Sequence, residues 1–331
     1  MRTILLIATG GTIASRPTAA GGLAPAITSQ ELLSCVPELA EFCRIDAIQL
    51  YNLDSTNMGP EQWQGIAAAV QENYDRYDGF VITHGTDTMG YTAAALSYMI
   101  QKSPKSVVLT GSQKSIYNRD TDARNNLWRA VAYACHPDAW GVQIVFDNQV
   151  ILGTRARKTR TKSFNAFSSI DYPETAMFRD RRLIQFLQRP ADYTHAVFST
   201  ALDPNVFVLR LVPGMRADII PMLEGRYRAL VLESFGVGGL PGGDDGAMFA
   251  AVRDWCGAGH LAVFTTQVPH EGSDLAVYEV GRAAKALPGV LEAHDMTPEA
   301  TAVKLMWVLG QTTDRAEAEK LFLTPVQWDI L

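Results

Sequence analysis

The chain has 331 residues, of which 47% are hydrophobic and 19% charged, and its formal net charge is -6 at pH 7. This length favours two domains and allows a sizeable core without disulfides. The acidic balance argues against nucleic-acid binding, which leaves a basic footprint, and no apolar run approaches the roughly 20 residues that span a bilayer.

The four cysteines form no CxxC pair and no spacing that resembles a metal site, so we interpret them as free thiols in a reducing compartment. The first residues, Met1–Ile7, could be mistaken for a short signal peptide. Their apolar run gives way at once to Thr9–Thr12 (TGGT), and cleavage after it would remove that motif. We therefore expect a first strand here and a cytoplasmic protein.

In the first half of the chain, short apolar runs alternate with helical stretches. We predict strands over residues 4–8, 45–51, 79–83, 106–110 and 142–146. Helices are expected to begin at Pro60 and to cover residues 91–101 and 122–135. Nearly continuous apolar strands separated by helices predict a parallel sheet covered on both faces. In such sheets, ligands bind at the carboxyl ends of the strands.

The alternation loosens over residues 171–193, where the charged run Arg179–Arg182 looks like part of a connection. Strands are predicted again at 206–212, 229–233 and 260–265, with helices near 246–256 and 298–309. Thr297 and Pro298 form a good start for the last helix. We predict an α/β fold: a larger, mostly parallel-sheet, Rossmann-like N-terminal domain (1–190), a connection with the first C-terminal strand (191–212), and a smaller C-terminal α/β domain (213–331).

Two threonine-bearing motifs follow predicted strands, Thr9–Thr12 after the first and His84–Thr88 (HGTDT) after the third. A Gly-Gly turn lets the backbone approach a ligand closely and donate from its N–H groups. Neither GxGxxG nor GxxxxGK[ST] occurs, so a nucleotide site is poorly supported. Alone, TGGT is more often a structural turn; two hydroxyls at strand ends instead suggest one shared site.

Thr86 stands beside Asp87, and a threonine hydroxyl is a poor nucleophile until a base removes its proton. A lysine can be that base, and the aspartate could orient it, hold a substrate ammonium, or only cap the next helix. Asp54 and Ser55, after the strand at 45–51, could grip the charged groups of an amino acid. Such residues also fill ordinary turns.

Seven segments, taken together and in order, resemble the bacterial-type L-asparaginases, most closely their type I, cytoplasmic branch. They are ILLIATGGTIAS, YNLDSTNMGPEQW, YDGFVITHGTDTMGYTAAALSYM, VVLTGSQ, GTRARKTRTKSFNAF, LVLESFGVGGLP and AVFTTQ. The resemblance covers essentially the whole chain. It implies hydrolysis of L-asparagine to L-aspartate and ammonia through a threonine acyl-enzyme, with no metal or organic cofactor.

The resemblance also implies roles for individual residues. Thr12 corresponds to the primary nucleophile, while Thr86, Asp87 and Lys158 correspond to the second catalytic group. The family's α-amino and α-carboxyl binding positions fall on Asp54 and Ser55. The expected oxyanion position lies near Gly11, Gly85 and the backbone N–H of Thr86.

One departure from the family pattern concerns the segment 15–28, which is either a plain linker or a mobile lid over the site. Many family members carry a tyrosine in this lid, paired with the nucleophile, whereas this chain has Gly21-Gly22-Leu23. Another group must then activate Thr12, and Tyr117 is a speculative candidate. His84 is more simply a hydrogen-bonded structural residue than a base.

Several alternatives stay open at this stage. A glutaminase or a mixed asparaginase-glutaminase differs by one methylene of substrate. A related tRNA-dependent amidotransferase carries an extra N-terminal domain, whereas this chain begins on the first core strand. A non-catalytic amino-acid-binding protein and a nucleotide-binding dehydrogenase come from other classes. The resemblance further implies a homodimer or homotetramer, acting on a small molecule and not on nucleic acid or membrane.

Overall fold

The computed structural model describes residues 1–17, 23–241 and 243–331. The chain forms two compact units, Met1–Thr200 and Ala201–Leu331. The boundary between them falls inside the 191–212 segment that the sequence assigns to the connection.

The N-terminal unit is built on an eight-stranded sheet. Across the sheet, the strands are β13 Arg182–Gln185, β12 Ala176–Arg179, β9 Gln149–Leu152, β8 Gly141–Phe146, β7 Ser106–Thr110, β5 Gly79–Thr83, β1 Arg2–Gly10 and β4 Cys43–Leu53. The run from β8 to β4 is parallel, and the other three strands extend it antiparallel. The predicted mostly parallel sheet is confirmed, and every residue of β5, β7 and β8 is buried.

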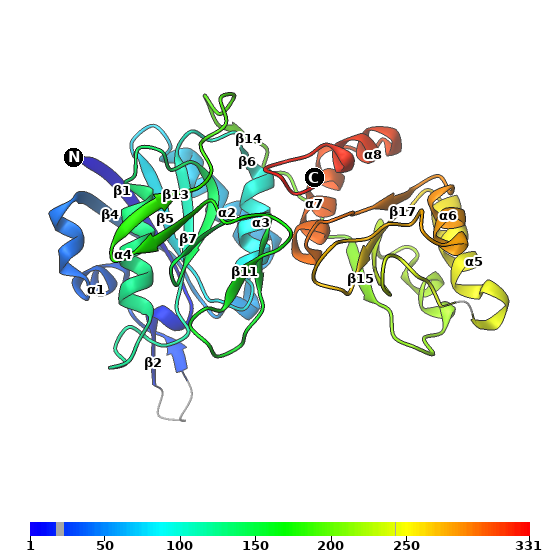
Figure 1. The fold of residues 1–331 in the computed structure, drawn as a ribbon, viewed down its shortest axis with the longest axis horizontal. Helices are drawn as coiled ribbons and strands as arrows, with labels where there is room; N and C mark the ends of the chain where they lie inside the picture. The colour runs from blue at the N-terminus through cyan, green and yellow to red at the C-terminus, as the bar shows by residue number, and fades with distance from the viewer. Residues whose placement is uncertain (18–22, 242) are drawn as a thin grey trace. The chain divides into compact units, whose positions relative to one another are not determined.

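Helices cover both faces of this sheet, as Figure 1 shows, with α1 and α4 on one side and α2 and α3 on the other. Their bounds are α1 Ser29–Ser34, α2 Pro60–Glu72, α3 Met89–Met99 and α4 Ala123–Ala134. Short 3-10 turns occur at η1 Thr12–Ala14, η2 Pro37–Glu41 and η3 Ser55–Asn57. The start of α2 at Pro60 agrees with the sequence, because proline fits the first helical position, where no N–H is needed.

The predicted connection at 171–193 is wrong in its central part, where β12 and β13 form a hairpin that completes the sheet. Its two-residue turn is Asp180-Arg181, with φ of 48° and 62°. Turns of this hand match the twist of paired strands but usually carry glycine or asparagine. Without those residues, the charged run looked like a linker.

Three two-stranded ribbons accompany the large sheet in this unit. They pair β2 Ser15–Pro17 with β3 Leu23–Pro25, β6 Ile100–Gln101 with β14 Val197–Phe198, and β10 Ala156–Lys158 with β11 Phe167–Ser169. The last ribbon carries Lys158 and was not predicted from the sequence.

The C-terminal unit contains a four-stranded parallel sheet in the order β15-β16-β17-β18. Its elements are β15 Val206–Arg210, η4 Ala217–Ile219, η5 Pro221–Leu223, β16 Ala229–Ser234, α5 Gly243–Gly257, β17 Leu261–Thr266, α6 Glu279–Lys285, β18 Val290–Glu292, α7 Pro298–Gln311 and α8 Arg315–Leu323. Thr297 caps α7 as predicted, its side chain accepting from the N–H of Ala300 at 3.1 Å. The sequence missed α6, α8 and β18.

A buried ion pair joins α7 to the C-terminal segment. Lys304 Nζ lies 2.7 Å from Asp329 Oδ2, and both side chains are completely buried. Lys304 also donates to the carbonyl of Thr324 at 2.9 Å. Burial lowers the pKa of Lys304, while the Asp329 carboxylate opposes that shift.

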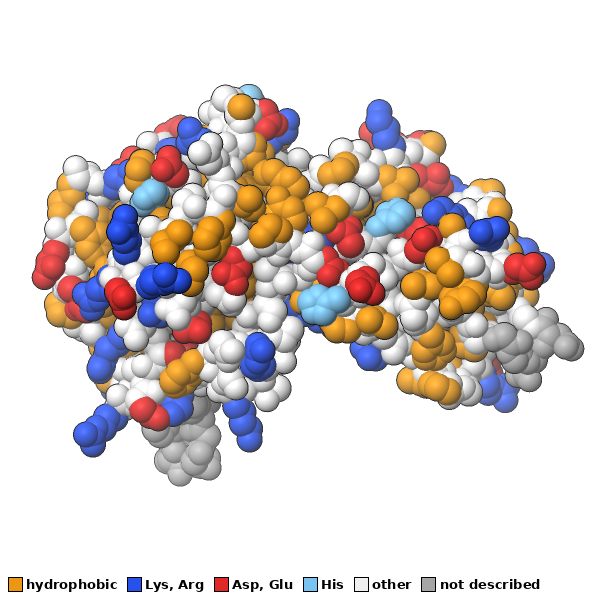
Figure 2. All heavy atoms as spheres, in the orientation of Figure 1, with side chains coloured by type: hydrophobic (Ala, Val, Ile, Leu, Met, Phe, Trp, Pro, Cys, Tyr) orange, Lys and Arg blue, Asp and Glu red, His pale blue; other side chains and the backbone are white. Residues whose placement is uncertain are grey.

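Figure 2 shows Lys and Arg side chains interspersed with Asp and Glu side chains on the face drawn there. Within the described residues, no helix combines the length and the apolar character that crossing a bilayer requires.

Candidate active site

A small polar cavity of about 80 Å³ opens where three neighbouring parallel strands end. Its lining consists of Gly11, Thr12, Ser15, Asp54, Ser55, Gly85 and Asp87. These residues follow β1, β4 and β5, which lie side by side in the order β5-β1-β4. The sheet therefore brings together residues from the two threonine motifs and the Asp54-Ser55 pair.

Glycines allow the three loops to pack backbone against backbone. Gly11 has φ of 80°, and a Cβ there would lie 2.4 Å from the backbone nitrogen of Gly85. A Cβ on Gly85 would lie 2.5 Å from Ser55 Oγ. Contacts this close exclude any side chain, so the Gly-Gly turn is needed for the loops to meet.

The backbone N–H of Gly11 donates to the carbonyl of Leu53 at 2.9 Å. It is therefore not the free donor that the sequence analysis expected near the oxyanion position. The backbone N–H groups of Gly85 and Thr86 make no hydrogen bond within the described residues.

Thr12 is the first residue of η1 and is half-buried on the cavity wall. Among the described residues, no group forms a hydrogen bond with its hydroxyl, which leaves the hydroxyl available to a ligand. The neighbouring Ser15 hydroxyl is occupied, because it donates to the carbonyl of Gly11 at 2.8 Å.

Lys158 joins the second threonine motif from a distant part of the chain. Its Nζ donates to Thr86 Oγ1 at 2.7 Å and to Asp87 Oδ1 at 2.6 Å. The Lys158 side chain is 15% exposed, whereas that of Asp87 is 62% exposed. Thr86 and Lys158 are not part of the cavity lining, and Asp87 links them to it.

Gln113, which sequence reasoning missed, contacts this group. The Thr86 hydroxyl donates to Gln113 Oε1 at 3.3 Å, and Gln113 Nε2 donates to the carbonyl of Ser163 at 3.0 Å. The Asp122 carboxylate accepts the backbone N–H of Gln113 at 2.9 Å. Burial raises the pKa of Asp122, although its hydrogen bonds oppose that shift. The only signal in the sequence was the position of Gln113 just after the fourth predicted strand.

His84 is fully buried beside the site and is hydrogen-bonded through both ring nitrogens. Its Nδ1 lies 2.7 Å from the carbonyl of Gly85, and its Nε2 lies 2.9 Å from Thr92 Oγ1. Burial lowers the pKa of His84 to about 4. The ring is therefore neutral near pH 7 and fixes the Gly85 carbonyl, which agrees with a structural role.

Tyr117 lies on a loop that is hydrogen-bonded to the loop after Thr12. The backbone N–H of Ile116 donates to the carbonyl of Ile13 at 3.3 Å, and Arg16 Nη2 donates to the Tyr117 hydroxyl at 3.2 Å. Tyr117 is half-exposed and does not line the cavity. Gly21 and Gly22, which stand where many family members carry the lid tyrosine, lie outside the described residues. The centre of the predicted lid lies outside them too.

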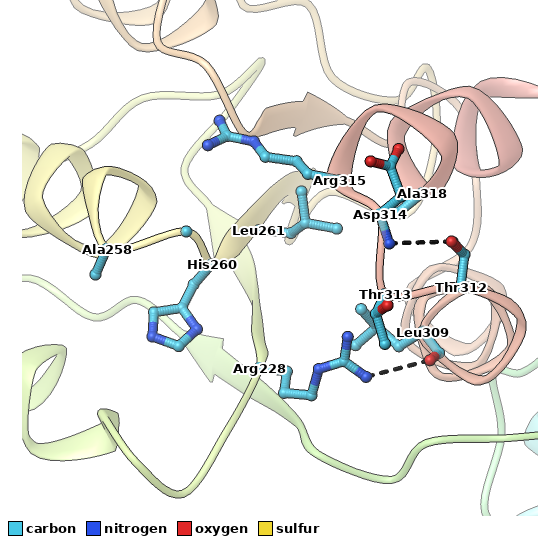
Figure 3. A pocket seen from close by; sticks show the side chains of 11 residues that line it. Arg228, Ala258, His260, Leu261, Leu309, Thr312, Thr313, Asp314, Arg315 and Ala318 are labelled. Atoms are coloured by element: carbon cyan, nitrogen blue, oxygen red, sulfur yellow. Dashed lines mark hydrogen bonds between the residues drawn. The ribbon is translucent and has the colours of Figure 1, made fainter.

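A second cavity, of about 250 Å³, lies within the C-terminal unit and is drawn in Figure 3. Arg228, His260 and Arg315 line it together with residues at the start of α8. Both guanidinium groups are already paired, Arg228 with Asp203 at 2.7 Å and Arg315 with Glu319 at 3.1 Å. None of the residues predicted for the site lines this cavity.

No group of three His, Cys, Asp or Glu side chains in the described part of the chain is arranged to hold a metal ion.

Two protein-family models match the chain. "Asparaginase, N-terminal" matches residues 3–191, and "Glutaminase/Asparaginase C-terminal domain" matches residues 205–322. An L-asparaginase of Thermococcus kodakarensis is 40% identical over 320 residues, which are 96% of this chain and 96% of that protein. One subunit of the glutamyl-tRNA(Gln) amidotransferase of Pyrococcus furiosus is 37% identical over 336 residues, covering 97% of this chain and 75% of that protein.

Solved structures of L-asparaginases are also similar to this chain. The thermostable L-asparaginase of T. kodakarensis superposes with a TM-score of 0.93 at 38% identity, with 99% of each chain covered. L-asparaginase I of Vibrio cholerae superposes with a TM-score of 0.86 at 28% identity, covering 100% of this chain and 99% of that one.

Proposed function

This chain belongs to the asparaginase family, and from that premise we propose that it hydrolyses the side-chain amide of L-asparagine to L-aspartate and ammonia. The observation that carries the proposal is the double contact of Lys158 with Thr86 and Asp87. This group adjoins a polar cavity where Thr12 presents an unengaged hydroxyl.

In the first half of the reaction, the Thr12 hydroxyl attacks the amide carbon, an ester forms on Thr12, and ammonia leaves. Negative charge develops on the carbonyl oxygen. The backbone N–H groups of Gly85 and Thr86, which have no hydrogen-bond acceptor among the described residues, are suited to stabilise that charge. Each such donor is typically worth about 3–4 kcal/mol. Water hydrolyses the ester in the second half.

Proton transfer is assigned to Thr86 and Lys158. When Thr86 accepts a proton from the attacking group, its own hydroxyl proton, which points to Gln113 Oε1 in this structure, can pass to an unprotonated Lys158 amine at the 2.7 Å contact. Asp87 orients the lysine through its 2.6 Å contact. Gln113 holds the Thr86 hydroxyl from the other side.

Recognition of the amino-acid part of the substrate is assigned to Asp54, Ser55 and Asp87. Asp54 Oδ1 already accepts the N–H and hydroxyl of Thr56, each at 3.0 Å, which fixes the carboxylate. Its other oxygen and the Asp87 carboxylate can hold the substrate ammonium. The Ser55 hydroxyl, without a hydrogen-bond partner among the described residues, can donate to the substrate carboxylate.

Ammonia release distinguishes this function from its alternatives. We expect the wild-type chain to release ammonia from asparagine. The ratio of kcat/KM for asparagine to kcat/KM for glutamine measures its preference. Both substrates must be assayed, because one methylene is worth only about 1–3 kcal/mol of discrimination. Thr86→Ala should lose activity, while Thr159→Ala, directly after β10 and next to Lys158, should retain it. A wild-type protein that binds asparagine without releasing ammonia would be an amino-acid-binding protein, and the proposal would be wrong.

The relationship to the glutamyl-tRNA(Gln) amidotransferase favours including glutamine in this assay, because its matching subunit shares 37% identity over nearly the whole chain. A strong preference for glutamine would point away from an asparaginase. We also propose a cytoplasmic homodimer or homotetramer, which sedimentation and cell fractionation can test.

A further inference from the structure

The peptide bond between Gly85 and Thr86 is held on its carbonyl side by His84. The carbonyl oxygen of Gly85 lies 2.7 Å from His84 Nδ1. This peptide bond is trans, so its carbonyl and its N–H point in opposite directions. The Thr86 N–H therefore points away from His84, and it has no hydrogen-bond acceptor in the part of the chain that the structure describes. Gly85 and Asp87, on either side of Thr86, both line the candidate active-site cavity.

The hydrogen bonds of the His84 ring define one tautomer. A carbonyl oxygen can only accept, so Nδ1 must carry the proton that is donated to Gly85. Burial lowers the pKa of His84 to about 4, so the ring is neutral near pH 7 and Nε2 is an acceptor. The Thr92 hydroxyl, 2.9 Å from Nε2, is then its donor. A ring with its proton on Nε2 would instead place the Nδ1 lone pair against the Gly85 carbonyl oxygen.

The core of the N-terminal unit anchors this ring. His84 is completely buried, and its backbone N–H donates to the carbonyl of Thr110, the last residue of β7, at 2.8 Å. The backbone packs closely there, because a Cβ on Gly111 would lie 2.3 Å from the His84 carbonyl oxygen. Thr92 is completely buried within α3. A strand end and a helix of the core therefore fix the position of the ring.

We propose that His84 is a positioning residue for oxyanion stabilisation and acts through the Gly85–Thr86 peptide bond. The inference rests on the proposed function, in which the Thr86 N–H stabilises the negative charge on the substrate carbonyl oxygen. By holding the Gly85 carbonyl, the ring fixes the direction of the Thr86 N–H before the substrate binds, which preorganises the donor. A hydrogen bond to the carbonyl also polarises the amide and strengthens its N–H as a donor. His84 itself neither touches the substrate nor transfers a proton.

This role has its own kinetic signature, because the negative charge on the oxygen develops only as the amide is attacked. Loss of the His84 donor should lower kcat and kcat/KM together and leave KM for asparagine nearly unchanged. Removal of a complete oxyanion donor costs about 10²–10³-fold in kcat. A donor that stays in place but loses its orientation should cost less, at least ~10-fold.

The experiment compares His84→Asn with His84→Leu in the full-length protein, by steady-state ammonia release from asparagine together with a thermal scan. The side-chain nitrogen of asparagine takes the place of Nδ1 and keeps the donor, so His84→Asn should retain most of the wild-type kcat. Leucine keeps the apolar bulk without a donor, so kcat should fall at least ~10-fold at unchanged KM. His195→Leu, at an exposed histidine, is the control and should leave both constants unchanged.

A second measurement does not depend on whether His84→Leu folds. Nitrogen NMR of the isotope-labelled histidine rings should show, at pH 7, a neutral His84 ring that is protonated on Nδ1. Its signals are identified by their absence from the spectrum of His84→Asn. A charged ring, or a proton on Nε2, would overturn the proposal.

Two kinetic outcomes would also overturn it: a folded His84→Leu protein with the wild-type kcat, or equal losses of kcat in the folded Asn and Leu variants. The first would leave His84 with a purely structural role, and the second would show that the donor to Gly85 is not what matters. A wild-type protein that releases no ammonia would instead refute the proposed function itself.

Discussion

Lys158→Met removes the amine that contacts both Thr86 and Asp87 while it keeps the length and apolar character of the side chain. The lost contacts are the hydrogen bonds at 2.7 Å and 2.6 Å. Proton transfer by a positioned side chain contributes about 10²–10⁴-fold to the rate. We therefore expect kcat/KM for asparagine to fall by about 10²–10⁴-fold, equivalent to about 3–5 kcal/mol of transition-state stabilisation.

Stability should change much less than activity in this variant. Asp87 is 62% exposed, so its carboxylate remains hydrated when the lysine is gone. Ion pairs with an exposed partner contribute at most about 1 kcal/mol. A thermal midpoint close to that of the wild type therefore separates lost chemistry from lost folding.

The assay is steady-state ammonia release at saturating and limiting asparagine, together with a thermal scan. Lys162→Met is the matched control, because Lys162 is an exposed lysine in the loop between β10 and β11. It should leave kcat/KM unchanged. Wild-type activity in a folded Lys158→Met protein would refute the assignment of proton transfer to this lysine.

Three further predictions concern the surroundings of the site and the C-terminal unit. Burial holds the pKa of His84 near 4, below its unfolded value of about 6.5, so stability should fall by up to ~3 kcal/mol as pH drops across that interval. In denaturant titrations, His84→Asn should weaken this change of unfolding free energy with pH. An unchanged pH dependence would count against its assignment to His84. Gly11→Ala should abolish activity, because φ is 80° and a Cβ would lie 2.4 Å from a facing backbone nitrogen. Gly214→Ala, with φ of 82° but open space, is its control, and its enzymatic activity should persist. Lys304→Met should cost about 3–5 kcal/mol because it removes the cation that faces the buried Asp329 carboxylate, and Lys304→Met/Asp329→Leu should recover part of that loss in urea melts.

The strands that carry the site could be predicted because their residues are apolar almost without interruption. The predicted strands at 79–83 and 106–110 agree with β5 and β7 to the residue. The motif residues Thr12 and Asp87 then had to lie at strand ends. Their adjacency depended on the order β5-β1-β4, which no local pattern specifies.

Other parts of the site had no local signal. Lys158 lies on the three-residue strand β10, and only the family resemblance pointed to it. Gln113 and Asp122 act through backbone turns and long-range contacts, which composition and periodicity do not reveal. The hairpin around Asp180 was missed because non-glycine residues adopt left-handed conformations there.

The most direct test of the central claim is ammonia release from asparagine by Thr12→Ala beside Thr12→Ser. The account predicts that Thr12→Ala loses at least ~10³-fold in kcat, since it assigns the attacking oxygen to Thr12, while Thr12→Ser keeps measurable turnover. Thr12→Ala with near wild-type turnover would contradict the assignment of Thr12 as the nucleophile.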